Sequence, residues 1–289
     1  IAERINNALA KKKAVTIMGP RQVGKSTLAE AIIPKDERVL EINGDNTDVQ
    51  TMFVDVDEAK IKILLGNNNF LFVDEAQKIQ NVGNMLKIVA DKFKEVKIIV
   101  TGSSSFKLSE AVNESLTGRK REFKLYPLSF KEMADYTSVL EESRLIEHRL
   151  IYGYYPEVVT SVGDEKEVIK ELIDSYLYKD VLEENNIAKP DHLVKLVQAL
   201  AFQIGSTVSA TELAGLVGID AKTVERYIEI LEKSYIIFTI PSYAKNQRNE
   251  LKFARKIYFW DMGIRNGVIG NMAPVSLRSP EELGHMWEN

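Results

Sequence analysis

Short apolar runs alternate with helical stretches over the first 127 residues. The runs lie near 14–18, 38–42, 70–74, 97–101 and 122–126, and amphipathic segments such as 28–32 separate them. A continuous apolar run is typical of a central strand that is buried on both faces. Strands alternating with helices predict a parallel sheet covered by helices, which is a three-layer α/β fold. A ligand is then expected at the carboxyl ends of the strands.

The pattern becomes purely helical after Pro127. Helical periodicity continues to about residue 205, with a long helix over 164–186 and a break at Tyr154-Tyr155-Pro156. We interpret residues 128–205 as a helical lid or linker whose apolar positions form core. Residues 1–127 would then be the α/β core, and the pattern changes again near residue 206.

A smaller unit is predicted over residues 206–262. Ser209 and Glu212 have the spacing of a capping box that opens a short helix, and Asp220 is placed to cap a second helix over 221–233. The apolar runs 236–240 and 257–260 could pair as the wing of a winged helix. Residues 263–289 then begin a further domain, with a helix near 279. Because the chain opens at Ile1 and stops inside this helix, we expect the natural protein to be longer.

Composition limits the classes that remain. A chain of 289 residues has room for roughly two domains, and 45% hydrophobic residues fits a globular class. The net charge of −4 provides no global basic field for nucleic acid. Without cysteine there is no disulfide framework or thiolate metal site, and the three histidines are far apart in sequence. No apolar stretch approaches the ~18 residues of a membrane span, so we expect no membrane partner.

The most informative segment is G-P-R-Q-V-G-K-S, which has the spacing of a phosphate-binding loop between a strand and a helix. Its glycines allow a tight turn that aims backbone N–H groups at phosphate oxygens, and the helix dipole adds to this. Lys25 would reach the β- and γ-phosphates, and Ser26 would hold Mg²⁺. The candidate nucleotide-binding residues are Gly19, Pro20, Arg21, Gln22, Val23, Gly24, Lys25, Ser26 and Thr27.

An acidic pair follows the apolar run near 70–74. Asp74 would hold Mg²⁺ at the end of the strand, and Glu75 is placed to take a proton from an attacking water. Acidic residues after a strand are also common helix caps. The phosphate loop favours the catalytic interpretation.

Two further candidates have competing interpretations. Ser103, which begins a run of three serines after 97–101, could sense the γ-phosphate, or the run could cap a helix near Phe106. Arg119 or Arg121 could act as an arginine finger in the same subunit or in a neighbour, or each could be a solvated surface cation.

The winged-helix segment offers a candidate surface for DNA. The second helix would enter the major groove, and the wing would contact phosphates. The helix is partly acidic, which opposes this, and winged helices also serve as protein-contact modules. The cations around the wing are Lys245, Arg248, Lys252, Arg255 and Lys256, and the acidic residues are Glu225, Glu229 and Glu232.

Several motifs together resemble prokaryotic AAA-type ATPases whose C-terminal half is a domain of unknown function. These are GPRQVGKSTL (19–28), VDEAQKI (73–79), TGSSS (101–105), LTGR (116–119) and YPLSF (126–130), and the similarity extends through YYPEV (154–158), YKDV (178–181), the winged helix and DMGIRN (261–266). The resemblance implies ATP and Mg²⁺ roles for Lys25, Ser26, Asp74 and Glu75, with Ser103 and Arg119 as sensor and finger. In this family a helix like that at 284–289 opens a nuclease-like domain similar to the PD-(D/E)xK fold. Here that domain is cut off almost at its start, so its activity is not assigned to these residues.

We therefore expect an ATP-binding, Mg²⁺-dependent P-loop ATPase of the AAA-like class. The chain would be cytoplasmic and could form a homo-oligomer, with DNA or a protein as the partner of the winged helix. The alternative is a nucleotide-dependent switch that binds DNA or protein with negligible turnover. Multiple-turnover phosphate release separates the two.

Overall fold

The computed structural model describes residues 1–103, 116–184, 187, 189–241 and 255–289. The chain divides at Tyr126 and Pro127 into two compact units, Ile1–Tyr126 and Pro127–Asn289, each continuous in sequence. The predicted helix near Phe106 and the wing cations Lys245, Arg248 and Lys252 lie outside the described residues.

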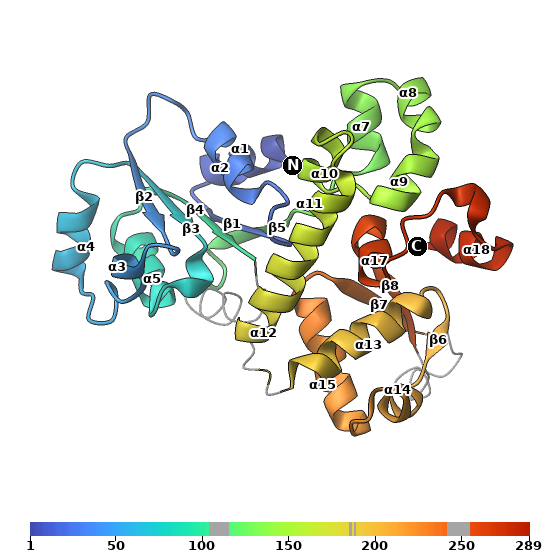
Figure 1. Ribbon diagram of the computed structural model, residues 1–289. Helices are drawn as coiled ribbons and strands as arrows, with labels where there is room; N and C mark the ends of the chain where they lie inside the picture. The colour runs from blue at the N-terminus through green and yellow to red at the C-terminus, as the bar shows by residue number, and fades with distance from the viewer. Residues whose placement is uncertain (104–115, 185–186, 188, 242–254) are drawn as a thin grey trace, which may run out of the picture. The chain divides into compact units, whose positions relative to one another are not determined.

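The first unit is built on a five-stranded parallel sheet with the order β2-β3-β4-β1-β5. Helices α1 and α2 lie on one face of the sheet and α5 lies on the other (Figure 1). The predicted three-layer α/β fold is confirmed. The strands are β1 (Ala14–Met18), β2 (Val39–Asn43), β3 (Phe70–Asp74), β4 (Lys97–Gly102) and β5 (Lys120–Lys124), and the helices are α1 (Ala2–Ala10), α2 (Lys25–Ile32), α3 (Thr47–Gln50), α4 (Glu58–Leu65), the 3₁₀ turn η1 (Ala76–Lys78) and α5 (Val82–Lys92).

Burial explains why the central strands could be read from the sequence. Every residue of β1 and β3 is buried, because helices cover both faces of the sheet. Ile5 of α1 and Ala29 of α2 pack against β1 and β3 in one apolar cluster. Strand β4 pairs with β1 on one side and with β3 on the other, so it lies between the two strands that carry the phosphate loop and the acidic pair.

The second unit is mainly helical and has one extended core. A single cluster of buried apolar residues runs from Leu150 to Met286, and the predicted segments 128–205, 206–262 and 263–289 all contribute to it. Its helices are α7 (Phe130–Tyr136), α8 (Val139–Arg144), α9 (Ile146–Tyr152), α10 (Pro156–Thr160), α11 (Glu165–Leu172), the π-helical segment η2 (Ile173–Asp180), α12 (Val181–Glu184), α13 (Pro190–Phe202), α14 (Ala210–Val217), α15 (Ala221–Lys233), α17 (Met262–Val268), the 3₁₀ turn η3 (Val275–Leu277) and α18 (Pro280–Glu288).

A small antiparallel sheet accompanies helices α13, α14 and α15. It has the order β6-β8-β7, with β6 (Thr207–Val208), β7 (Ile237–Pro241) and β8 (Arg255–Phe259). The predicted pairing of the two apolar runs is confirmed, since Ile237 lies opposite Phe259. Asp220 caps α15 by accepting from Thr223 N, as predicted.

The capping box predicted at Ser209 is wrong. Ser209 occupies the N-cap position of α14, but its side chain accepts no capping hydrogen bond. Glu212, which would complete the box, instead accepts from Gln203 Nε2 at 3.3 Å. The long helix predicted over 164–186 is also interrupted, because residues 173–180 form the π-helical segment.

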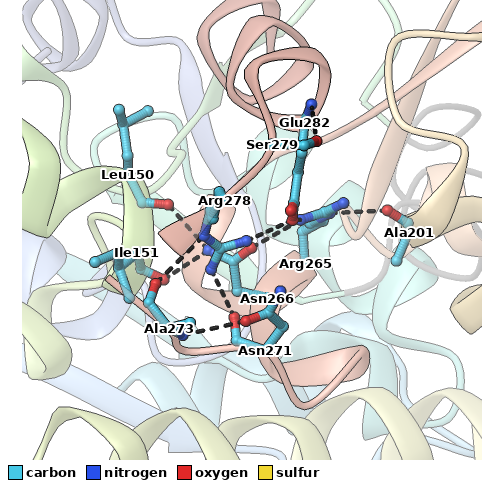
Figure 2. Close-up of polar contacts among 10 residues, drawn as sticks. All are labelled: Leu150, Ile151, Ala201, Arg265, Asn266, Asn271, Ala273, Arg278, Ser279 and Glu282. Atoms are coloured by element: carbon cyan, nitrogen blue, oxygen red, sulfur yellow. Dashed lines mark hydrogen bonds and ion pairs between the residues drawn. The ribbon is translucent and has the colours of Figure 1, made fainter. Parts of the chain in front are cut away.

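Polar side chains of the 261–266 segment hold α9 against α17. Asp261 Oδ2 accepts from Tyr154 N at 2.7 Å, and Gly153 and Gly263 leave room for the carboxylate beside them. Asn266 is fully buried, and its Nδ2 donates to Leu150 O at 2.9 Å and to Ile151 O at 2.8 Å (Figure 2). These bonds satisfy carbonyls at the end of α9 that have no partner within the helix.

Figure 2 also shows two buried arginines that extend this network. Arg265 Nε donates to Ala201 O at 2.8 Å, and Arg265 Nη1 lies 3.1 Å from Glu282 Oε1. Arg278 Nη1 donates to the same carboxylate at 2.5 Å. Glu282 therefore pairs with both guanidinium groups, and Arg265 links α17 to α18 through this carboxylate and to α13 through Ala201 O.

Candidate functional site

The phosphate loop leaves the carboxyl end of β1 and enters α2, as predicted. Gly24 has φ 90° at the N-cap of α2, and Gln22 has φ 59°, so the loop contains two residues in left-handed conformation. A Cβ on Gly19 would lie 2.0 Å from Leu125 O, so only glycine lets the loop pass beside the segment that follows β5. The result is a turn whose backbone N–H groups and helix dipole favour an anion.

Lys25 is an unusually buried cation. Its side chain is 4% exposed, and Nζ donates to Pro20 O at 2.7 Å. Burial lowers the pKa of Lys25 to about 8, and the nearby charges of Glu75 and Asp74 oppose this effect. Additional negative charge beside Nζ would therefore stabilise the protonated form.

Ser26 and Asp74 meet at the carboxyl ends of β1 and β3. Ser26 Oγ lies 2.9 Å from each carboxylate oxygen of Asp74, and Thr101 of β4 also donates to Oδ1. Hydroxyl and carboxylate oxygens are hard ligands of the kind Mg²⁺ prefers. In the described residues no cluster of three or more His, Asp or Glu could hold a metal alone. The pair therefore fits an ion whose remaining ligands are phosphate oxygens and water.

Glu75 belongs to a polar triad that includes one residue missed from the sequence. Gln77 Nε2 donates to Glu75 Oε2 at 2.6 Å and to Ser103 Oγ at 2.8 Å, and Ser103 Oγ lies 3.4 Å from the same carboxylate oxygen. Glu75 has φ 47°, and this left-handed turn directs η1 so that Gln77 folds back onto it. The structure thus brings Ser103 next to Glu75, with Gln77 bridging them.

Gly44 is a second residue that the sequence did not indicate. Its N–H donates to Asp74 O at 2.9 Å, and a Cβ there would lie 2.3 Å from Glu75 O. The end of β2 therefore supports the Asp74–Glu75 turn from the side. The only available signal was a glycine directly after a strand, which is too common to identify such a contact.

Arg119 lies away from these residues. Ala14 N, at the start of β1, donates to Arg119 O, so Arg119 is at the amino end of the sheet. The length of β1 separates that edge from the phosphate loop by roughly 13 Å. The side chain of Arg119 is 51% exposed and pairs with Asp91. The structure does not bring Arg119 to the phosphate loop of its own subunit, and a finger role in a neighbouring subunit stays a prediction.

The predicted DNA surface is only partly described. Lys256 Nζ pairs with Glu288 Oε1 at 2.6 Å, and Arg255 lies beside it on β8. Helix α15 buries Val224, Ile228 and Leu231. The exposed residues of α15 include both positive and negative side chains, namely Lys222, Glu225, Arg226 and Glu229.

A parallel sheet with this loop, the Ser26–Asp74 pair and a strand between the two site strands defines a P-loop NTPase fold. Residues 11–134 match the family model described as AAA domain, and residues 143–274 match Domain of unknown function (DUF8612). The two matches and the fold support an AAA-type P-loop ATPase family with this C-terminal domain.

The chain is also similar to other proteins in sequence and to a solved structure in fold. The chain is 27% identical to an uncharacterized protein of Methanocaldococcus jannaschii, over 97% of this chain and 66% of that protein. It is 23% identical to an uncharacterized protein of Mycobacterium tuberculosis, over 99% of this chain and 63% of that protein. The chain thus spans less than two thirds of these curated relatives. The Walker-type ATPase PABY2304 of Pyrococcus abyssi has a similar fold, with a TM-score of 0.61 and 15% identity over 93% of this chain and 95% of that one.

No described helix has both the length and the apolar character needed to span a membrane.

Proposed function

We propose that the chain binds ATP with Mg²⁺ and hydrolyses it, and that the nucleotide state is coupled to a partner bound by the second unit. The observation that carries this proposal is the convergence of Lys25, the Ser26–Asp74 pair and Glu75 at the carboxyl ends of β1, β3 and β4. The same edge is where ligands bind in open α/β sheets.

Each side chain has a distinct role in this mechanism. Lys25 and the loop amides stabilise the charge on the phosphates, and Ser26 and Asp74 hold Mg²⁺. Mg²⁺, when bound, neutralises the charge that develops on the phosphate oxygens. Glu75 takes a proton from the attacking water.

Gln77 and Ser103 act as positioning residues for Glu75 in this proposal. Both contact Oε2, so they orient the carboxylate and leave Oε1 to accept the proton of the water. A misplacement of 1 Å at such a base can reduce the rate by about 10²-fold, which makes their contribution measurable.

Two variants separate binding from chemistry. Lys25→Ala is expected to abolish ATP binding in calorimetry, because the buried ammonium contacts phosphate directly. Glu75→Gln is expected to retain ATP but to stop multiple-turnover phosphate release. Undiminished hydrolysis by Glu75→Gln would remove Glu75 as the base, and slow release by the wild type with tight ATP binding would favour the switch alternative.

The partner of the second unit is proposed from the order of its elements. Helix α13, β6, helices α14 and α15, then β7 and β8, follow one another as in a winged helix. Because α15 exposes both acidic and basic residues and Lys256 is paired, we expect any duplex DNA binding to be weak and salt-dependent. Fluorescence anisotropy at low salt tests this, with Arg255→Glu expected to weaken binding. If the wild type binds no duplex with or without ATP, the winged helix is a protein-contact module.

A further inference from the structure

The second unit contains a cavity of about 240 Å³ that is separate from the phosphate site. The only two tryptophans of the chain, Trp260 and Trp287, both line it, together with Tyr154. Trp287 is 60% exposed and lines the cavity together with Asn289. Its volume is below the ~300 Å³ of a drug-sized pocket, which limits it to a group of about the size of one aromatic side chain.

Arg149 lines this cavity, and part of its guanidinium group has no hydrogen-bond acceptor among the described residues. The Arg149 side chain is 7% exposed, and its Nε donates to Oε1 of the fully buried Glu142 at 3.0 Å. Within the described part of the chain, Nη1 and Nη2 donate to no acceptor. Both nitrogens keep some contact with solvent, so a ligand oxygen at this position would replace water as their acceptor.

The surroundings of Arg149 are fixed by the network described above. The next two carbonyls along α9, Leu150 O and Ile151 O, both accept from Asn266 (Figure 2). Asp261 also lines the cavity, but its oxygens accept from Tyr154 N and Ile264 N. The cavity is therefore preformed, and Asp261 is not the acceptor for Arg149.

The local charges decide which oxygen fits. Glu142 already balances Arg149, and Asp261 adds a second carboxylate. An anionic ligand would bring a third negative charge to one buried cation, whereas a neutral carbonyl accepts the same hydrogen bonds without that penalty.

We propose that this cavity binds an aromatic group next to a neutral carbonyl or amide oxygen, with the ring against Trp260 and Trp287 and the oxygen on Arg149. Such a group could be an aromatic residue of a partner peptide or a small aromatic amide. The proposal is independent of ATP hydrolysis, because every residue in it belongs to the second unit.

Intrinsic tryptophan fluorescence tests the proposal, since both tryptophans line the cavity. N-acetyl-phenylalanine amide should produce a saturable change with a Kd on the order of 1 mM, as expected for a ligand of this size. N-acetyl-phenylalanine, which carries a carboxylate, and N-acetyl-alanine amide, which has no ring, should each bind at least about fivefold more weakly. A peptide with a central phenylalanine that binds more than about tenfold more tightly than the amide would identify a peptide as the source of the group, and equal binding would identify a small molecule.

Three variants separate the cavity from general effects on the fold. Arg149→Lys keeps the charge beside Glu142 but loses the planar donors, so amide binding should weaken about tenfold. Trp287→Ala removes a mostly exposed wall, should leave the fold intact by circular dichroism, and should weaken binding similarly. Arg144→Lys on α8 is the matched control, because Arg144 is exposed, pairs with Glu141 and does not line the cavity.

Two results would overturn the proposal. The first is the absence of a saturable change with N-acetyl-phenylalanine amide. The second is unchanged affinity in Trp287→Ala and in a folded Arg149→Lys. If Arg149→Lys fails to fold, Trp287→Ala decides the outcome.

Discussion

ATP binding should draw a proton from solution above pH 8. Burial lowers the pKa of Lys25 to about 8, so Lys25 is neutral in about three quarters of the free molecules at pH 8.5. A triphosphate beside Nζ favours the cation and returns its pKa toward the ordinary value of lysine. Binding should therefore take up about 0.7 proton at pH 8.5 and about 0.1 proton at pH 7.

The same shift gives the pH dependence of stability a definite sign. Between pH 8 and the ordinary lysine pKa, the unfolded chain binds more protons than the folded chain, so the free energy of unfolding rises with pH. The full shift corresponds to about 3 kcal/mol in the nucleotide-free chain. Bound ATP should remove most of this rise, because Lys25 then stays protonated in the folded state as well.

Calorimetry in buffers of different ionisation enthalpy measures the proton uptake directly. Glu75→Gln is the informative control, because the Glu75 charge raises the pKa of Lys25 and its removal should let uptake begin at lower pH. Equal uptake at pH 7 and pH 8.5, or a smaller uptake by Glu75→Gln at pH 7.5, would refute this account of the lysine.

The remaining predictions concern the triad, the oligomer and the second unit. Gln77→Ala should lower kcat by about 10- to 100-fold with the Kd for ATP nearly unchanged, measured by phosphate release and calorimetry, and faster turnover would contradict a positioning role. If Arg119 acts in trans, Arg119→Ala should lower turnover at unchanged ATP affinity and should be rescued by added Glu75→Gln protein; turnover independent of protein concentration would argue against this. Asn266→Leu leaves two buried carbonyls without donors and should reduce the free energy of unfolding in urea by about 2–5 kcal/mol, whereas Asn84→Leu, at an exposed position, should change it by less than about 1 kcal/mol.

The sequence was sufficient to predict the sheet because its central strands carry a strong local signal. Strands β1 and β3 are buried on both faces and are mostly apolar, and they were placed correctly. Strand β5 was predicted two residues late, since its residues 120–122 are polar and partly exposed. Arg119 precedes the strand with either boundary, so it lies at the amino edge of the sheet.

Contacts that depend on special backbone geometry or on distant residues could not be predicted from periodicity. Gln77 reaches Glu75 only because Glu75 adopts a left-handed conformation. The bond between Asp261 and Tyr154 N joins positions 107 residues apart, and no local pattern encodes it. The failed capping box at Ser209 is the opposite case, since a correct local pattern lost Glu212 to a contact with Gln203.

Asp261 fits between Gly153 and Gly263. The substitutions that position 153 tolerates therefore depend on the residue at position 261. A Cβ on Gly153 would lie 2.1 Å from Asp261 Oδ1, so a smaller residue at position 261 would remove that clash and leave the cost of a φ of 77°. A Cβ on Gly263 would lie 2.0 Å from Tyr152 O, and no change of side chain removes a backbone oxygen. Substitutions at 153 and 261 should therefore show strong epistasis, while Gly263 stays fixed in every background. An evolving lineage would have to change position 261 first before position 153 could follow.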